Sequence, residues 1–428
     1  MISVIYGLKF EKNENKSVLL IEFNPEMYEK LFYEIKNLGM EVVLINSRRS
    51  SVWSKKSISI LKKTQAKIIT LSDFLEKKDN KTIIKKSEFL REEFLKIFEN
   101  ENSLKQIFSI NGISFWEIIK KQVISMYLSR IVERLSYVLI AKKLFNEKKF
   151  SSILSLNLSG ESEKVFTNSK YTSIMLQHAF GNYSKEIKSL EMTDDLNLIK
   201  GKIAVWGDVI KNYLLDNYNI SEENIIVSGS PRHDLFFEEQ KVNDNELILL
   251  TPRPIINDIV GEDTKKYELY EETIKRIITA VENSKSKLVV KLHPQKNQHN
   301  NDIKDMIQKI NPEIEIYQDV SILELLKKCK LMINLSPDNY DASTTILEAM
   351  IMKKPVLDVT LEKKRFGFEF LKDKAIETLD FESDIENLIF EIITNQNKHK
   401  DLIKNSQIHL RKYLANQGNA SKILAENL

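Results

Sequence analysis

The sequence has one cysteine, Cys329, among its 428 residues. A single thiol cannot form an intramolecular disulfide or a cysteine-based zinc cluster, so a reducing compartment is expected. Glycine is also scarce, with 11 residues, and neither G-x-G-x-x-G nor G-x-x-x-x-G-K-[ST] occurs. The glycine-rich loops that hold phosphate in dinucleotide-binding proteins and P-loop NTPases are therefore excluded. A bound phosphate would need other ligands.

Long apolar runs are absent as well. No stretch approaches the roughly 18 residues that a membrane-spanning helix needs, and the first residues lack the apolar core of a signal peptide. The 64 Lys and Arg against 61 Asp and Glu leave a net charge of +3, which does not indicate a nucleic-acid partner. With 42% hydrophobic and 29% charged residues, we expect a globular, cytoplasmic protein.

Short β-branched apolar runs alternate with longer amphipathic runs, which is typical of parallel sheets covered by helices. The predicted strands form two series, 17–23, 41–47, 66–71, 151–158, 172–178, 202–207 and 224–230, then 246–254, 287–295, 313–318, 330–336 and 354–360. Residues 87–149 are predicted to be mostly helical. We expect these helices to be packed, with their lysines reaching solvent; a helix on an anionic membrane surface is the alternative.

The two series predict an α/β protein of two doubly wound domains. The first covers residues 1–236, with 87–149 as a helical insertion. The second covers 237–428 and ends in a helix that is able to pack back on the first domain. The linker is expected near 236–245. In such sheets ligands bind outside the carboxyl ends of the strands, so the site is expected there.

Polar residues end the strands of the second predicted domain. Thr251 and Arg253 end one strand, and Lys291 and His293 end the next; Asn334 and Ser336 end another, before a helix that starts at Ser343, Thr344 and Thr345. Hydroxyl groups, positive charges and the unpaired N–H groups of a helix start together favour an anion site. The first domain offers Glu161 and His178 in the same position.

The hydroxyl-rich helix start has a second explanation. Thr345-Ile346-Leu347-Glu348 fits the Thr-x-x-Glu capping box, in which side chains satisfy the first N–H groups without a ligand. The two explanations are compatible, because one helix start has several unpaired N–H groups.

Five stretches occur in an order that resembles a known family. They are IMLQHAF (174–180), AVWGDVIKNYLL (204–215), IIVSGSPRHDLF (225–236), VVKLHPQ (289–295) and NYDASTTILEAMIMKKPVLDV (339–359), closed by YLANQGNASKILAENL (413–428). Residues 154–428 resemble the GT-B-fold proteins of bacterial and archaeal surface-carbohydrate synthesis. These include capsule-polysaccharide transferases, CDP-glycerol glycerophosphotransferases, and sialyl- and polysialyltransferases; the sugar-nucleotide 2-epimerases are more distant.

The resemblance implies a GT-B fold, in which two facing Rossmann-like domains bind the substrates in an interdomain cleft. It also implies roles for single residues. His293 would contact the donor phosphate, Ser343, Thr344 and Thr345 would donate to the same phosphate, and Glu348 would bind the ribose hydroxyls. Many relatives have glycine after Gln-His, where this sequence has Ala179.

Glycosyl transfer requires a stabilised phosphate leaving group and, for inversion, a base. Thr251, Arg253, Lys291 and His293 would serve the leaving group together with the hydroxyl-rich helix. Glu161 and His178 are the alternatives for the base. Histidine titrates near neutral pH, whereas Glu161 would need a pKa raised by burial. The acidic motif of the sialyltransferases gives Glu161 a slight preference, although the glycerophosphotransferases use a histidine.

We therefore predict a glycosyltransferase that acts on a surface glycan or a lipid-linked precursor. A CMP-linked acidic sugar and a UDP-sugar are both open as donors. No Asp-x-Asp motif occurs, so neither a metal nor another cofactor is expected. The alternatives are a CDP-glycerol or polyol-phosphate transferase and a non-catalytic nucleotide-sugar-binding or glycan-binding domain. Contact with the inner face of a membrane, or with a polysaccharide-assembly partner, is compatible with each hypothesis; no nucleic-acid partner is expected.

Overall fold

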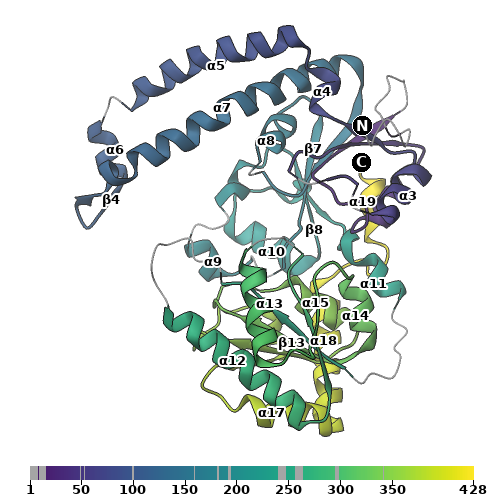
Figure 1. Ribbon diagram of the computed structural model, residues 1–428. Coiled ribbons are helices and arrows are strands. Elements are labelled where there is room, and N and C mark those ends of the chain that lie inside the picture. Colours follow the sequence, from purple (N-terminus) through teal and green to yellow (C-terminus); the bar gives the residue numbers. More distant parts are fainter. Residues whose placement is uncertain are drawn as a thin grey trace. The chain divides into compact units, whose positions relative to one another are not determined.

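The computed structural model describes residues 8, 16–48, 50–52, 54–98, 101–158, 160–180, 183–190, 194–239, 247–255, 264–294, 298–340 and 342–428. The chain divides into two compact units. The first unit consists of residues 1–177, 198–204 and 424–428, and the second of 178–197 and 205–423. The second unit thus contains residues 178–197 and 205–236, which the sequence analysis assigned to the first domain. Figure 1 gives the element labels used below.

The first unit is built on a parallel sheet in the order β3-β2-β1-β6-β7-β8. Its strands are β1 (Ser17–Ile21), β2 (Glu41–Ile45), β3 (Lys67–Ile69), β6 (Phe150–Ser155), β7 (Thr172–Leu176) and β8 (Lys202–Val205), and β9 (Ile225–Val227) follows β8 in the sheet order. Counted along the sheet, this is the doubly wound order 3-2-1-4-5-6 of Rossmann-like folds. The strand order reverses at β1, between β2 and β6.

Helices cover this sheet because their apolar residues recur at helical spacing. Helix α2 (Glu29–Asn37) buries Leu31, Phe32 and Ile35. The C-terminal part of α7 (Trp116–Glu147) packs Tyr137 and Ile140 against strands β1, β2 and β6, together with α8 (Glu161–Thr167). This unit also contains α3 (Lys55–Lys63) and α4 (Leu71–Phe74).

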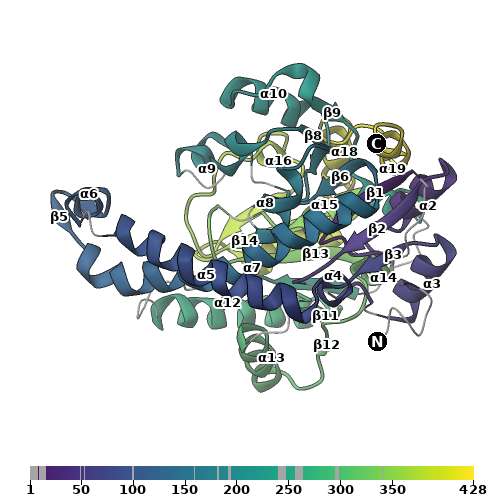
Figure 2. The same cartoon turned by 90° about the horizontal axis from the view of Figure 1, so that it is seen from above.

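A long arm leaves the first unit between β3 and β6 (Figures 1 and 2). It consists of α5 (Lys77–Ile97), α6 (Glu101–Ile107), the antiparallel pair β4 (Ser109–Ile110) and β5 (Ile113–Ser114), and α7. The mostly helical prediction for 87–149 is confirmed, although α5 starts earlier, at Lys77. The small hairpin was not predicted, because two-residue strands are too short to show an alternating pattern.

The second unit repeats the same topology. Its parallel sheet has the order β12-β11-β10-β13-β14-β15. The strands are β10 (Leu247–Pro252), β11 (Lys287–Lys291), β12 (Glu315–Tyr317), β13 (Cys329–Ser336), β14 (Val356–Thr360) and β15 (Glu377–Asp380). Strand β15 was not predicted, because its partly exposed residues include only one large apolar side chain. The predicted α/β class with parallel sheets is confirmed.

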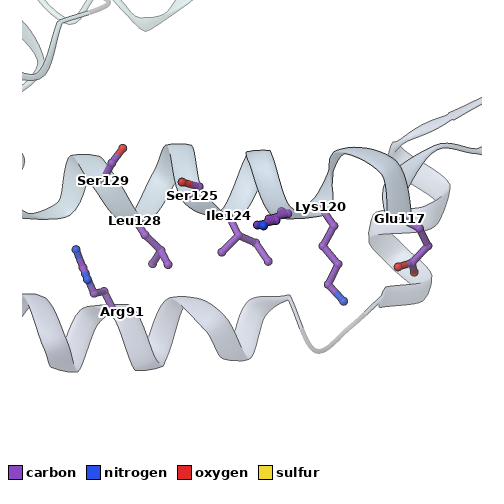
Figure 3. Close-up of a pocket in the computed structure, with 8 residues that line it drawn as sticks. Arg91, Glu117, Lys120, Ile124, Ser125, Leu128 and Ser129 are labelled. Carbon is purple, nitrogen blue, oxygen red and sulfur yellow. The ribbon is translucent and has the colours of Figure 1, made fainter.

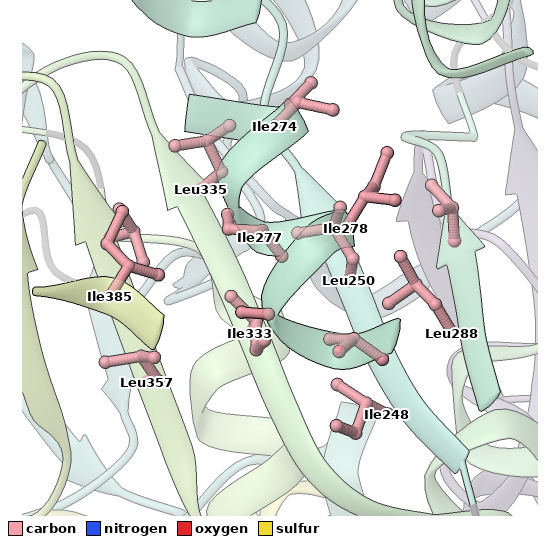
Figure 4. Packing of buried hydrophobic residues seen from close by; sticks show 14 of the residues in the cluster. Ile248, Leu250, Ile274, Ile277, Ile278, Leu288, Ile333, Leu335, Leu357 and Ile385 are labelled. Carbon is pink, nitrogen blue, oxygen red and sulfur yellow. The ribbon is translucent and has the colours of Figure 1, made fainter. Parts of the chain in front are cut away.

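Three helices cover one face of this second sheet. They are α12 (Thr264–Asn283), α13 (Gln298–Ile310) and α17 (Ile385–Thr394). Figure 4 shows Ile274, Ile277 and Ile278 of α12 lying over Leu250 of β10 and Ile333 of β13. The spacing of the three isoleucines places them on one side of the helix. Helices α14 (Ile322–Lys328) and α15 (Thr344–Ile351) pack on β13, and α18 (Gln396–Tyr413) packs on α15.

The segment after α18 contacts Trp206, which follows β8 and belongs to the second unit. The N–H of Ala415 donates to the carbonyl of Trp206 at 2.8 Å. Gly229 has a φ of +83°, and a Cβ there would lie 2.3 Å from the carbonyl oxygen of Ala415. The carboxylate of Asp234 accepts bonds from the N–H groups of Ala420 and Ser421 at the start of α19 (Ala420–Glu426). The positive φ of Gly229 and its close approach to Ala415 require glycine at position 229.

The second unit also contains α9 (Lys185–Ser189), α10 (Asp208–Asn217), α11 (Asp234–Glu238) and α16 (Glu369–Lys372). Cys329, the first residue of β13, is fully buried, and burial raises the pKa of its thiol to about 12. In the part of the chain that the structure describes, no helix is both long and apolar enough to cross a membrane.

Candidate functional site

Polar side chains lie in a row across the carboxyl ends of the second sheet. The register pairs Thr251 of β10 with Asn334 of β13, and Asn334 with Asp358 of β14. Lys291 is the last residue of β11, one position after the pair formed by Leu250 and Val290. The sheet therefore brings Thr251 and Lys291 to the same edge as Asn334, as the sequence analysis expected of strand ends.

The central part of this row is a buried hydrogen-bond network. The amide of Asn334 donates to Asp358 Oδ1 at 2.7 Å and the hydroxyl of Ser336 donates to the same oxygen at 3.1 Å. Thr251 Oγ1 donates to Asn334 Oδ1 at 3.2 Å, and Arg365 lies 2.8 Å from Asp358 Oδ2. The hydroxyl of Thr251 thus bonds within the protein and holds the strand ends in place. Sequence reasoning missed Asp358 and Arg365, since each resembles an ordinary surface charge.

Lys291 is buried at the same edge. Its ammonium donates to the carbonyls of Leu292 at 2.8 Å and Gln318 at 2.9 Å. Burial lowers the pKa of Lys291, and the nearby carboxylate of Glu348 opposes this shift. Its charge therefore lies against two carbonyl groups rather than in open solvent.

His293 and Arg253 each follow their strand by one or two residues. The carbonyl oxygen of His293 accepts hydrogen bonds from the side chains of Asn300, at 3.1 Å, and Gln318, at 3.2 Å. Arg253 donates its N–H to Leu335, and its carbonyl accepts from the hydroxyl of Tyr270 at 2.7 Å. Both side chains are half-buried. These bonds fix the backbone at positions from which the two side chains can reach a ligand.

The hydroxyl-rich start of α15 is capped differently from the prediction. Ser343 is the N-cap residue, and its Oγ lies 2.7 Å from the hydroxyl of Thr345 and accepts the N–H of Thr345. The predicted capping box of Thr345 and Glu348 is wrong, because Glu348 is engaged in an ion pair. Thr344 and Thr345 are only half-buried. The helix start therefore keeps N–H and hydroxyl groups near the surface of the sheet edge.

Glu348 is the centre of a buried charged cluster. Arg232 donates to Glu348 Oε1 at 2.9 Å, and His233 Nε2 lies 3.7 Å from the same oxygen, beyond hydrogen-bond distance. His233 Nδ1 lies 2.7 Å from the hydroxyl of Ser230. Burial would raise the pKa of Glu348, but the charge of Arg232 and the contact with His233 outweigh it and lower the pKa. Burial lowers the pKa of His233.

This cluster therefore holds an ionised carboxylate beside a neutral imidazole. Among the described residues, Glu348 Oε2 has no hydrogen-bond partner, although it is buried. A buried acceptor without a donor is costly, so this oxygen is suited to a donor from a ligand. Sequence reasoning named Glu348 but missed His233. The Ser-Pro-Arg-His stretch at 230–233, where proline starts a short 3-10 turn, was the available signal.

The two candidates for the base lie in different units. Glu161 starts α8 in the first unit and is nearly buried. Both of its oxygens bond to the guanidinium of Arg134 on α7, with Nη2 at 3.0 Å from Oε1. Burial alone would raise the pKa of Glu161, but Arg134 outweighs it and lowers the pKa. His178, in the second unit, is exposed.

In the described ranges, no group of three or more His, Cys, Asp and Glu side chains is placed to hold a metal ion. The expectation of a metal-independent reaction stays a prediction.

A family model described as LIC12162 family transferase matches residues 263–363, which contain His293, the Ser343 to Thr345 helix start and Glu348. No curated protein matches.

Two solved structures share the fold. The UDP-GlcNAc 2-epimerase of Neisseria meningitidis, bound to UDP-GlcNAc, is 14% identical, with a TM-score of 0.54; the match covers 96% of this chain and 98% of that one. The wall teichoic acid polymerase TagF is 12% identical, with a TM-score of 0.52; the match covers 99% of this chain and 91% of that one. The predicted fold of two Rossmann-like domains of the GT-B type is confirmed. The transferase description and this fold together support the prediction of a glycosyltransferase.

Proposed function

We propose that the protein is a glycosyltransferase that moves a sugar from a nucleotide-activated donor to a surface glycan or its lipid-linked precursor. One observation carries the proposal: Glu348 is a buried, ionised carboxylate with one oxygen that lacks a hydrogen-bond donor among the described residues, and it lies one turn inside a helix that starts with three hydroxyl residues. A ribose diol supplies such a donor, and a phosphate suits such a helix start.

The roles of the surrounding residues follow from their chemistry. Ser343, Thr344 and Thr345 offer hydroxyl and N–H groups to the donor phosphate. Arg253 and His293, on the strand ends, supply positive charge or hydrogen bonds as the phosphate leaves. Lys291 lies deeper, where its ammonium contributes charge while it bonds to two carbonyls.

For the base we propose His178 over Glu161. Arg134 bonds to both oxygens of Glu161 and lowers its pKa, which makes this carboxylate a weak proton acceptor. In the proposed step, the acceptor hydroxyl attacks the anomeric carbon and gives its proton to His178. The bond from that carbon to the phosphate oxygen breaks, and the electron pair leaves with the nucleotide.

A thermal-shift panel of CMP, CDP, UDP and GDP tests the donor site. A nucleotide at 100 times its Kd should stabilise the protein by about 2.7 kcal/mol. We expect one nucleotide to stand out and to lose its effect in Glu348→Gln. If no nucleotide stabilises the protein, the proposed donor site is wrong.

Turnover is tested by nucleotide release and by the mass of the product. A product that gains a sugar without phosphate supports the proposal, whereas a product that gains a polyol phosphate supports the polyol-phosphate transferase. Nucleotide binding without release supports a binding domain.

His293→Ala should reduce turnover at least a hundredfold without lowering the melting temperature, because its side chain is half-buried and serves the leaving phosphate. His399→Ala is the matched control, since His399 lies near Lys354 at the opposite, amino end of β14. Full activity in His293→Ala would contradict the proposed role.

A further inference from the structure

The arm of residues 77–147 gathers most of the exposed apolar side chains of the protein. It carries 13 of the 20 large hydrophobic residues that are exposed in the described part of the chain. The C-terminal part of α7 is packed on the sheet, as expected, whereas its first half leaves apolar side chains such as Ile118 and Met126 exposed. Exposed apolar side chains that gather in one region indicate an interaction surface.

The strongest concentration is at the tip of the arm. Four isoleucines, Ile107, Ile110, Ile113 and Ile118, are between 67% and 80% exposed. We call them the tip isoleucines. Ile110 and Ile113 face each other across the β4 and β5 pair, which turns through Asn111 and Gly112, both at positive φ. Asn-Gly at positive φ is a favoured two-residue hairpin turn, so Ile110 and Ile113 belong to a regular hairpin.

The tip has a small core of its own. The tip isoleucines are therefore exposed on a folded element. Trp116 is fully buried, and its ring stacks on those of Phe98, at 5.7 Å, and Phe108, at 5.1 Å. The largest side chains of the tip are thus used to fold it. The tip isoleucines are not part of this core and stay exposed to solvent.

Positive charge accompanies the apolar tip. Residues 77–147 carry 14 Lys and Arg against 9 Asp and Glu, a net charge of +5, whereas the rest of the chain carries 50 against 52, a net charge of −2. The excess of positive charge in the protein therefore lies entirely on the arm. An acidic surface is the complementary partner.

A groove between α5 and α7 lies close to the tip. It has a volume of about 640 Å³, and its lining includes three cations, one carboxylate and two apolar side chains: Arg91, Lys120, Lys121, Glu117, Ile124 and Leu128. Figure 3 shows Arg91 extending from α5 toward the side chains of α7. Among the described residues, neither Arg91 nor Lys121 has an ion-pair partner, whereas Lys120 pairs with Glu101. Two such cations beside apolar side chains suit a phosphate attached to a hydrocarbon chain.

We propose that the arm docks on an anionic lipid membrane, with the tip isoleucines in the interface and the groove at the level of the lipid phosphates. Apolar residues that enter the boundary of the acyl chains, and cations that bind acidic headgroups, are the two components of interfacial binding. A second copy of the chain is a poorer occupant. A stable dimer buries about 800 Å² over 20 to 30 residues of each partner, more than four isoleucines at a narrow tip provide.

The test is sedimentation of the full chain with vesicles of phosphatidylcholine, with and without phosphatidylglycerol. We expect strong binding only to the vesicles that contain phosphatidylglycerol. Ile110→Ser/Ile113→Ser should weaken this binding at least tenfold, because it removes apolar surface from the tip. Arg91→Gln/Lys121→Gln should weaken it about tenfold and make binding less sensitive to salt.

Leu190→Ser/Leu198→Ser is the matched control, because both leucines are more than half exposed outside the arm. It should bind as the wild type does, and all variants should keep the wild-type melting temperature. Failure of the wild type to sediment with either vesicle would overturn the proposal, as would equal binding to both. Analytical ultracentrifugation without lipid provides a further check: self-association that the isoleucine variant abolishes would assign the tip to a dimer instead. Since the readout is binding alone, it is independent of the proposed activity.

Discussion

The buried cluster around Glu348 predicts a large effect from a single substitution, Arg232→Gln. In the folded protein the side chain of Glu348 is only 3% exposed, and Arg232 is its hydrogen-bonded cation. Loss of one partner from a buried ion pair typically costs 3 to 5 kcal/mol, since the other charge stays behind without compensation. The side chain of Arg232 is 24% exposed, which favours the lower limit, about 3 kcal/mol.

In a domain of the size of the second unit, a loss of about 3 kcal/mol lowers the melting temperature by roughly 6 to 12 °C. The exposed arginine Arg411 provides a matched control, because Arg411→Gln changes the same side chain at the surface of α18 and should cost less than about 0.5 kcal/mol.

A double-mutant cycle with Glu348→Gln separates the charge effect from lost packing. The double variant has no buried charge at this position, so it should be more stable than Arg232→Gln alone by at least about 1 kcal/mol. Unfolding by urea at pH 7, followed by circular dichroism, provides the four free energies. If Arg232→Gln unfolds like the control and the second substitution restores no stability, Glu348 is not held as a buried anion, and the proposed donor site is wrong.

Two further predictions concern stability. Gly229→Ala should lower the melting temperature markedly, because its Cβ would meet the carbonyl of Ala415 at 2.3 Å, whereas Gly39→Ala, also at positive φ but with nothing within 4 Å, should cost only about 1 kcal/mol; equal effects would contradict the close approach. Burial lowers the pKa of His233 in the folded state. Below pH 6.5, the pKa of an unperturbed histidine, the unfolded state therefore binds a proton that the folded state does not, and the free energy of unfolding decreases by up to about 1.4 kcal/mol for each unit by which the pH is lowered. His233→Gln should make this pH dependence shallower, and an unchanged slope would refute it.

Much of the fold could be predicted from the sequence because the strands of both sheets are short, apolar and β-branched. Val289 and Val290 in β11, or Val42 and Val43 in β2, show this directly. Strand β15 was not predicted, because its residues are partly exposed and mixed in polarity. The ends of the strands could also be predicted, because polar residues such as Thr251 directly follow runs of apolar residues.

The partners of those polar residues could not be predicted, because they depend on long-range contacts. Glu348 has a helical spacing to Thr345 that suits a capping box, yet it bonds to Arg232, which lies 116 residues earlier in the sequence. Burial makes that ion pair stronger than a bond to an exposed N–H group. In the same way, the sequence near Glu161 does not reveal that Arg134 holds both of its oxygens and keeps its pKa low.

The single thiol of the protein has a practical consequence. Cys329 is fully buried at the start of β13, and its raised pKa keeps the thiol protonated at neutral pH. It therefore reacts very slowly with an alkylating reagent. A cysteine placed at a surface position would therefore be the dominant reactive group, with no need to replace the native one. Nitroxide or fluorescent probes attached at Asn111 would then test by spectroscopy whether the end of the arm enters a bilayer.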